Sequence, residues 1–283
     1  MTDLQMPPER KFGWELKPIE SSHFAIHERA NGQFCVVLNH ALLRGVTSEM
    51  LRWWFLNFTN LRVNLKDVDG YEGESLPAYL LWHPSDHLSA ELSGSLGPGS
   101  TAQAGVFIEI KEAMQYLKYG WKYPVNNKLT VFYCDHDGWA MGKEIPVLGK
   151  IMMLRIHFKD VHEANEHVGV HYHYEIVIGV TNDNPFGRFI NSRVKKHFSP
   201  EFFEAWQTHN VIEVGNFENF LPALFAQRGR GNDLSYENAL NEAQSPANQI
   251  GHDRVLFEER IEGYKKTDNP HEYQGYTHPS FLA

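Results

Sequence analysis

The spacing of hydrophobic and polar positions changes near residue 77 and again near residue 200. From Pro200 to Gln227, apolar residues occupy much of a helical wheel, with Ser199 placed as N-cap and a proline in the first turn. Before that helix, apolar runs between Gly, Pro, Asn and Asp loops predict strands at about 77–83, 105–112, 128–135, 151–159 and 168–180. The pattern predicts an α+β fold in which a curved antiparallel sheet packs around one long helix and leaves a cavity between them.

The flanking parts of the chain show different patterns. Residues 1–65 are predicted to form a small N-terminal unit, with a buried strand at 33–39 and a helix at 48–60 that is capped by Thr47 or Ser48. Aromatic residues surround this helix, so we expect it to be buried on more than one side: Trp53, Trp54, Phe55 and Phe58. Residues 66–227 form the predicted main domain. Residues 228–283 are polar and irregular, with a short helical stretch near 254–264, and are expected either to wrap the main domain or a second subunit or to be mobile.

Composition narrows the classes of partner. The formal net charge is −9 and no Lys/Arg-rich block occurs, which argues against nucleic acid and anionic membranes as partners. No run of 18 apolar residues and no secretory signal pattern is present. The two cysteines, Cys35 and Cys134, are too few for a disulfide framework in 283 residues. We therefore expect a soluble cytoplasmic protein.

Histidine is abundant, with 16 in the chain, and it is both a common metal ligand and a group that titrates near neutrality. On the predicted long helix, His209 and Glu213 are four residues apart, so their side chains share a face and can reach one metal ion. Large apolar residues on both sides predict that this pair faces inward, where a carboxylate must be paired or bound to a metal. The simpler alternative is an exposed pair on an ordinary helix.

Two upstream segments offer further ligands. His83 and His87 flank a Pro-Ser-Asp turn, and a predicted strand carries Glu109 and Glu112. Strand alternation points these two glutamates to opposite faces, so only one of them can reach the cavity. Two histidines and two glutamates from three elements could close a divalent-metal site. A histidine that only fixes the turn and a solvent-facing glutamate are the simpler interpretations.

A second histidine-rich stretch supports an alternative. His171 and His173 share a strand face, which favours a cupin-like iron oxygenase, although Glu175 follows them more closely than the cupin pattern requires. His157, near the end of the preceding predicted strand, is either an active-site acid or base or a satisfied core histidine. Nucleophile-elbow, P-loop, dinucleotide and Cys-x-x-Cys motifs are absent from the sequence, which disfavours serine and nucleotide chemistry.

Taken together, these motifs resemble the 2,4-diacetylphloroglucinol hydrolase and phloretin hydrolase family over roughly residues 65–227. The resemblance rests on Trp-His-Pro-x-Asp-His at 82–87, a strand-end glutamate at Glu112 and the helical His209-x-x-x-Glu213. It implies a helix-grip fold similar to the Bet v 1 and START group, a homodimer, and hydrolysis of the carbon–carbon bond between an acyl group and a phenolic ring. It also implies a Zn²⁺ ion that is held by His83, Glu112, His209 and Glu213.

The substrate positions match that family less closely. Where the family has a tyrosine before the first histidine, this chain has Ser75, and an expected asparagine is Asp86. His157 and Tyr172 resemble a substrate-contacting pair of the family. We expect Tyr172 and Tyr79 to bind the substrate, an acyl-phenol or a 1,3-diketone. The groups expected to move protons are His157, Asp86 and His87.

A non-catalytic function is the main competing hypothesis. A helix-grip cavity can hold an apolar ligand without chemistry, because a fold does not determine a function. A carrier of this kind is expected to bind no tight metal ion, whereas the hydrolase is expected to hold one in its site.

Overall fold

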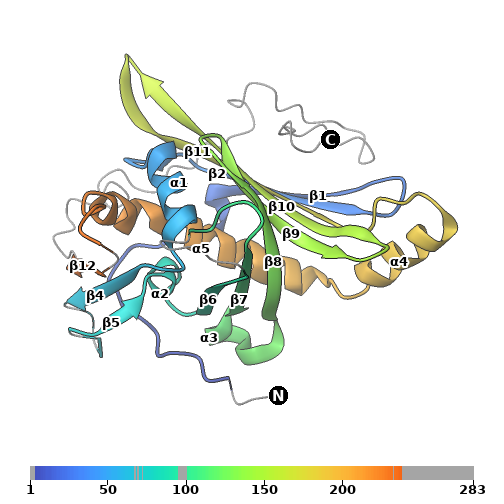
Figure 1. Cartoon of the computed structure of the whole chain (residues 1–283), viewed down its shortest axis with the longest axis horizontal. Coiled ribbons are helices and arrows are strands. Elements are labelled where there is room, and N and C mark those ends of the chain that lie inside the picture. The colour runs from blue at the N-terminus through green and yellow to red at the C-terminus, as the bar shows by residue number, and fades with distance from the viewer. Residues whose placement is uncertain are drawn as a thin grey trace.

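The computed structural model describes residues 4–66, 68, 70–71, 73–94, 101–231 and 233–237. Within this part of the chain, a nine-stranded antiparallel sheet has the order β1-β2-β11-β10-β9-β8-β7-β6, and the short β3 pairs with β11 (Figure 1). Its strands are β1 (Ser22–Glu28), β2 (Phe34–His40), β3 (Leu43–Arg44), β6 (His87–Ser93), β7 (Phe107–Ala113), β8 (Pro124–Cys134), β9 (Gly138–Ile145), β10 (Gly149–Glu163) and β11 (Glu166–Ile178). A small second sheet has the order β12-β4-β5, from β12 (Asp233–Glu237), β4 (Arg62–Lys66) and β5 (Ser75–Pro77).

One long helix, α5 (Pro200–Phe225), runs beneath the strands of the large sheet (Figure 1). The sheet bends around it, helped by bulges where the register shifts between Val131 and Tyr133 and between Lys150 and Met152. The remaining helices are α1 (Ser48–Asn57), α2 (Tyr79–Trp82), α3 (Tyr116–Tyr119), α4 (Pro185–Lys195) and the 3₁₀ turns η1 (Ile19–Ser21) and η2 (Gly120–Lys122). The fold is therefore the expected α+β helix-grip arrangement, a curved antiparallel sheet around a long helix.

The start of α5 follows from its sequence. The Ser199 hydroxyl accepts a hydrogen bond from the Phe202 N–H at 3.1 Å, and Pro200 occupies the first turn, where its missing N–H costs nothing. Such a cap stabilises a helix by about 1 kcal/mol. Most of the helix after Ala205 is buried, including the polar residues His209, Asn210 and Glu213. A helix that is enclosed in this way can carry polar side chains into the interior only where other groups pair with them.

The aromatic helix of the N-terminal region packs as expected. Thr47 caps α1 by accepting a hydrogen bond from the Met50 N–H at 3.2 Å. Trp54 and Phe55 are fully buried and contact the rings of Trp82 and Phe217 from the next segments of the fold. Burying a large side chain of this kind contributes about 1.5–3 kcal/mol. This helix is accordingly buried on more than one side and links the sheet to α5.

The division at residue 65 does not coincide with a break in the sheet. Strand β2 pairs with β11 over six positions, so the predicted N-terminal unit supplies strands to the same sheet as the main domain. Before β1, the segment 4–18 is anchored by Lys17, whose ammonium contacts Glu218 of α5 at 2.7 Å, and by the buried Arg10. From the predicted C-terminal tail, residues 233–237 form β12, which pairs in parallel with β4. The helical stretch predicted near 254–264 lies outside the described residues.

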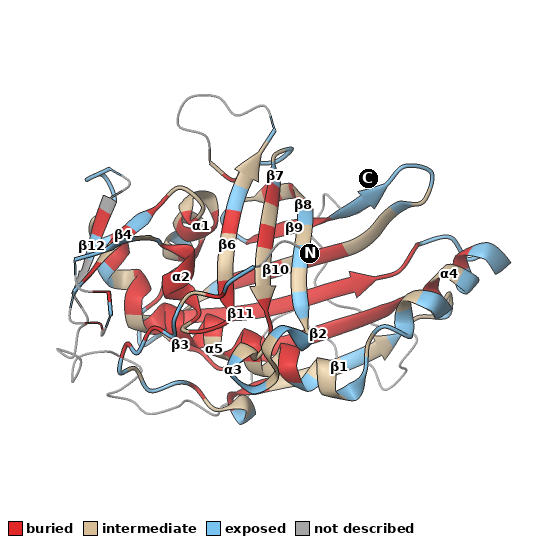
Figure 2. Cartoon of the chain, turned by 90° about the horizontal axis from the view of Figure 1, so that it is seen from below, coloured by how far each residue is buried: buried red, intermediate tan, exposed pale blue. Residues whose placement is uncertain are grey.

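Several predicted elements differ in the structure. The strand predicted at 77–83 is instead the short strand β5 followed by the helix α2, so His83 caps a helix rather than ending a strand. Strands β1, β6 and β9 and the helix α4 were not predicted. Strand β6 has only Leu88, Ala90 and Leu92 as apolar residues, and α4 is largely exposed, unlike the buried strands β2 and β11 (Figure 2). Strands β1 and β6 are the two edges of the sheet, whereas the unpredicted β9 lies inside it between β10 and β8. No described helix is long and apolar enough to cross a membrane.

Candidate metal centre

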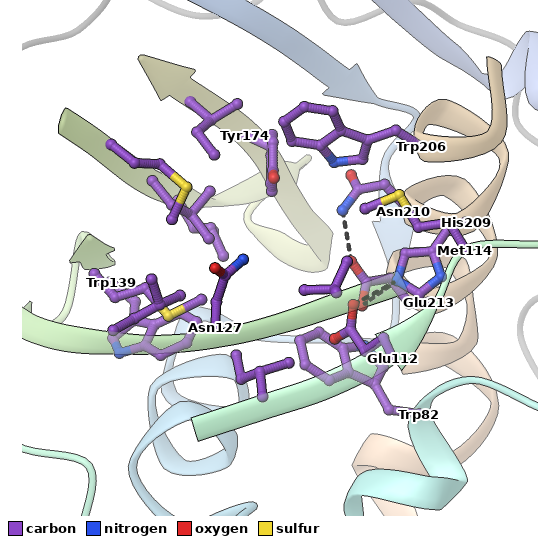
Figure 3. A pocket seen from close by; sticks show the side chains of 18 of the residues that line it. Trp82, Glu112, Met114, Asn127, Trp139, Tyr174, Trp206, His209, Asn210 and Glu213 are labelled. Atoms are coloured by element: carbon purple, nitrogen blue, oxygen red, sulfur yellow. Dashed lines mark hydrogen bonds and ion pairs between the residues drawn. The ribbon is translucent and has the colours of Figure 1, made fainter. Parts of the chain in front are cut away.

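A cavity of about 230 Å³ lies between α5 and the inner face of the sheet. Its walls are mainly apolar and aromatic, and Asn127 adds an amide from β8 (Figure 3). At one end the polar residues Glu112, His209 and Glu213 point toward one another (Figure 3). A mostly apolar pocket with a few convergent polar groups is the usual form of a small-molecule site.

Two histidines direct a ring nitrogen into this polar end. His87 starts β6, and its Nδ1 lies 2.9 Å from the carbonyl oxygen of Tyr79. His209 lies on α5, and its Nδ1 is 2.9 Å from Asp86 Oδ2. Each Nδ1 therefore donates a proton, so Nε2 is the nitrogen that remains to bind a metal. Metal-bound histidines are held in this way, with the outer nitrogen donating to a carbonyl or carboxylate.

Two carboxylates complete the group. The Tyr79 hydroxyl donates a hydrogen bond to Glu112 Oε1, and the Asn210 amide donates one to Glu213 Oε1 at 2.6 Å. Burial, together with the charge of Glu112, raises the pKa of Tyr79 well above its usual value, so this phenol stays a donor. These bonds fix the orientation of both glutamates. Glu109 points to the other side of β7, where it contacts Lys111 at 3.1 Å, so Glu112 is the glutamate that reaches the cavity.

The separations among these four groups fit a shared cation. Nε2 of His87 is 3.8 Å from Glu112 Oε1 and 3.4 Å from Glu213 Oε2. Nε2 of His209 is 3.6 Å from Glu112 Oε2 and 3.7 Å from Glu213 Oε2. These distances exceed a hydrogen bond of about 2.7–3.2 Å. Two ligands at about 2.1 Å from one tetrahedral ion are separated by roughly 3.4 Å. The donor set of two imidazoles and two carboxylates therefore fits a divalent metal.

Without a cation, burial and the mutual charges of these four groups shift the pKa values of several of them. Burial raises the pKa of Glu213 to about 7 against the opposing charge of His209. Burial alone would lower the pKa of His209, but the hydrogen bond to Asp86 and the charges of Glu213 and Glu112 raise it to about 9. Burial also lowers the pKa of His87 to about 4, so this imidazole is neutral. A neutral imidazole next to buried carboxylates is the state that binds metal.

His83 occupies a different place from the one expected for it. Its Nδ1 accepts hydrogen bonds from the N–H groups of Ser85 at 3.2 Å and Asp86 at 3.1 Å. The ring proton consequently sits on Nε2, which faces Asp86 Oδ2 at 3.4 Å. Ligand atoms of His83, Asp86 and His209 also gather within 4.8 Å of one another. Both histidines direct N–H groups at this carboxylate, so no lone pair points inward, and the geometry favours His87 over His83 as a ligand.

Asp86 is a hydrogen-bond hub rather than a group that faces the cavity. Besides His209, it accepts hydrogen bonds from the N–H groups of Gln115 at 2.7 Å and Tyr116 at 2.9 Å and from the Ser85 hydroxyl at 3.0 Å. The surrounding charge of His83 and the hydrogen bond of His209 hold the pKa of Asp86 well below its usual range, although burial opposes them. The carboxylate stays ionised and orients His209. The proton-transfer role expected for Asp86 does not match this position.

The remaining predicted residues divide between the two faces of the sheet. Tyr172 lines the cavity, together with the other even-numbered residues of β11. His171 and His173 lie on the opposite face, as does His157, which pairs with His173 across the two strands. His157, expected to act in catalysis, therefore does not face this cavity, and neither do His171 and His173, the ligands of the alternative iron centre. Tyr79, expected to bind substrate, lines the cavity and also contacts Glu112 and His87.

Sequence reasoning missed two residues behind the carboxylates. The ring nitrogen Nε2 of His40 lies 2.9 Å from the Asn210 Oδ1 atom, so His40 donates to the amide that in turn donates to Glu213. Asn210 was detectable in principle, because it lies three residues before Glu213 on the same helix. His40 belongs to β2 and was not detectable, because only the folded sheet brings it to α5.

Comparison with known proteins gives only distant structural matches. No protein-family model and no curated protein matches the chain. Among solved structures, the crystal structure of Ara h 8.0201 aligns with 12% identity and a TM-score of 0.30, over 66% of this chain and 98% of that chain. A protein of unknown function from Staphylococcus aureus aligns with 10% identity and a TM-score of 0.33, over 65% of this chain and 96% of that chain. The class defined by strand order and site is a helix-grip protein with a candidate metal centre.

Proposed function

We propose that this protein is a zinc-dependent hydrolase that cleaves the carbon–carbon bond between an acyl group and a phenolic ring. The supporting observation is the set of four converging groups, His87, Glu112, His209 and Glu213, at ligand–ligand separations of 3.4–3.8 Å. The motif resemblance to the diacetylphloroglucinol and phloretin hydrolases supports the reaction class. The ligand set differs from the expected one in a single member, His87 in place of His83.

Zinc suits this donor set. It accepts imidazole nitrogen and carboxylate oxygen at about 2.0–2.2 Å and has no geometric preference from its d-electrons. When bound, it supplies a Lewis acid that polarises an acyl carbonyl and lowers the pKa of water toward neutrality. The hydrogen bonds from His209 to Asp86 and from His87 to the Tyr79 carbonyl would hold the imidazoles in place for it.

The cavity provides for the organic part of the substrate. Tyr172 and Tyr174 present phenols whose pKa values are raised well above the usual value by burial, so both remain donors for a hydroxyl or carbonyl oxygen. Aromatic residues of the lining offer faces to a flat ring. The overall reaction adds the hydroxyl of water to the acyl carbon and its hydrogen to the ring carbon. The bond between these two carbons breaks, which gives a carboxylic acid and the deacylated phenol.

The test combines metal analysis with turnover. The protein is stripped with a chelator, reloaded with zinc, and assayed for bound zinc and for hydrolysis of acylphloroglucinols, dihydrochalcones and linear 1,3-diketones. We expect one zinc ion per chain and release of a carboxylic acid from at least one of these classes. Glu112→Gln is expected to lose both, whereas Glu109→Gln, the same change on the opposite face of β7, retains both. Tight zinc binding by Glu112→Gln would contradict the site.

A non-catalytic apolar-ligand carrier is the second candidate, because most of the cavity lining is apolar. The two functions differ in two measurable properties. A carrier binds its ligand equally well after zinc is removed, and it releases no acid from any member of the panel.

A further inference from the structure

The cavity is elongated along α5, which runs antiparallel to β11. The ring centroids of Tyr172 and Phe217 are 6.2 Å apart, and those of Tyr174 and Trp206 are 6.3 Å apart. Further along, Ile178 pairs with Phe34, whose ring contacts Phe198 just before α5 at 5.0 Å. The metal centre, on His209 and Glu213, is level with the tyrosines, so the cavity continues from it toward the N-terminal end of α5.

Beside the metal centre the lining is aromatic. Phe58 contacts the rings of Trp82 at 5.9 Å and Trp139 at 6.2 Å, and all three residues line the cavity with Tyr172. Aromatic faces at such spacings favour offset or edge-to-face contacts with another flat ring. This part of the cavity is suited to the ring of a phenolic substrate.

Beyond the tyrosines the sheet presents two aliphatic rows. Leu154 pairs with Met141 on one side and with Ile176 on the other, and all three line the cavity. The next row outward pairs Met152 with Ile178, which also line it. From Tyr174 to Ile178 the strand advances four residues, or about 13 Å at roughly 3.3 Å per residue. A space this long within about 230 Å³ is narrow, and flexible methionines adapt to a chain better than to a rigid second ring.

We propose that the substrate carries an extended aliphatic acyl chain, which lies along these two rows while its phenolic ring lies against the aromatic lining. The reacting carbonyl between ring and chain is then level with His209 and Glu213. This inference rests on the proposed hydrolase function for its chemistry, but the seat for the chain can be tested by binding alone.

Burial of each added methylene in an apolar space improves binding by about threefold to fourfold. We therefore expect the affinity of the zinc-free and the zinc-loaded protein, read from tryptophan fluorescence, to increase along acetyl-, butanoyl- and hexanoyl-phloroglucinol. The increase should be roughly a hundredfold from acetyl to hexanoyl. Trp82, Trp139 and Trp206 line the cavity and provide the signal. Acetylphloroglucinol with a butyl group on its ring is the isomer control, and it should not show this gain.

Substitutions locate the chain. Ile178→Phe or Met152→Phe fills the outer row and should reduce the hexanoyl-to-acetyl affinity ratio by at least tenfold, with zinc content unchanged. Ile145→Phe, the same change at a side chain that is 36% exposed on the β9 hairpin, should leave the ratio as it is. Using two blocking variants keeps the test informative if one of them fails to fold.

The outcomes separate this inference from the proposed function. Three results would overturn the proposed binding site for the acyl chain. They are equal affinity along the acyl series, an equal gain from the ring-alkylated isomer, and an unchanged hexanoyl-to-acetyl affinity ratio in both blocking variants. Turnover of the acetyl compound together with one of these results would leave the hydrolase standing without it. If affinity increases with acyl-chain length but no compound is turned over, the binding site for the chain is supported and the hydrolase function is refuted.

Discussion

The two sides of the His209 ring show how the same residue types build two different kinds of site. On the Nε2 side, His87, Glu112 and Glu213 lie 3.4–3.8 Å from their neighbouring ligand atoms, beyond hydrogen-bond distance. On the Nδ1 side, Asp86 accepts hydrogen bonds of 2.7–3.0 Å, including the one from His209. The first side can take a cation in exchange for the second ring proton of His209, whereas the second is already saturated. The position of ring protons, rather than the number of His and acidic residues, distinguishes them.

The largest expected effect comes from replacing each of the two neighbouring histidines, His87 and His83, with alanine in separate variants. His87→Ala removes a nitrogen whose lone pair faces the carboxylates, and we expect zinc affinity to fall by more than a hundredfold. His83→Ala removes an acceptor for two backbone N–H groups, so it should lower the free energy of unfolding by about 1–3 kcal/mol while one zinc still binds. Chelator competition and denaturant unfolding measure the two quantities. The opposite pattern would restore His83 as the ligand.

The pH dependence of the stability of the metal-free protein tests the hydrogen-bonded residues behind the metal centre. Burial lowers the pKa of His40 to about 3, below the ordinary value of 6.5, so the unfolded chain binds more protons between these values. This stabilisation is complete above pH 6.5 and is lost as the pH falls toward 3. Between pH 6.5 and 4.5 His40 alone should account for about 2–3 kcal/mol. His40→Gln keeps a donor for Asn210 but cannot titrate. The free energy of unfolding, measured with urea, should therefore fall less steeply between pH 6.5 and 4.5 in this variant. An unchanged fall would contradict the assignment.

Asp86→Asn is expected to lower zinc affinity less than His87→Ala does. The amide can still accept the His209 Nδ1 proton but carries no charge, so zinc affinity should fall about tenfold to a hundredfold while the stoichiometry stays the same at saturation. Isothermal titration with zinc measures both. Complete loss of the zinc site would mean that Asp86 itself is a ligand.

The smallest effect is expected on the opposite face of the sheet. His157→Gln should change zinc affinity and acyl-phenol binding by less than twofold, because this side chain lies on the far side of β10 from the cavity. A marked fall in turnover at full zinc occupancy would return His157 to the active site.

The sequence predicted the α+β class from the alternation of apolar positions and the long capped helix, because these are local properties of neighbouring residues. It also predicted Glu112, His209 and Glu213 as a group. The i,i+4 spacing on a helix and the alternation along a strand specify which side chains share a face. The choice of Glu112 over Glu109 was left open at that stage, and the structure resolved it.

Tertiary structure decided what depended on distant pairing. His87 lies opposite Glu112 only because β6 pairs with β7, and β6 gave a weak apolar signal. His157 and Tyr172 seemed a pair by spacing, but the register of β10 and β11 places them on opposite faces. The sequence determined which donors the chain possesses, and the fold determined which nitrogens keep a lone pair inside the cavity. Ring-proton positions depend on hydrogen-bond partners that are far apart along the chain.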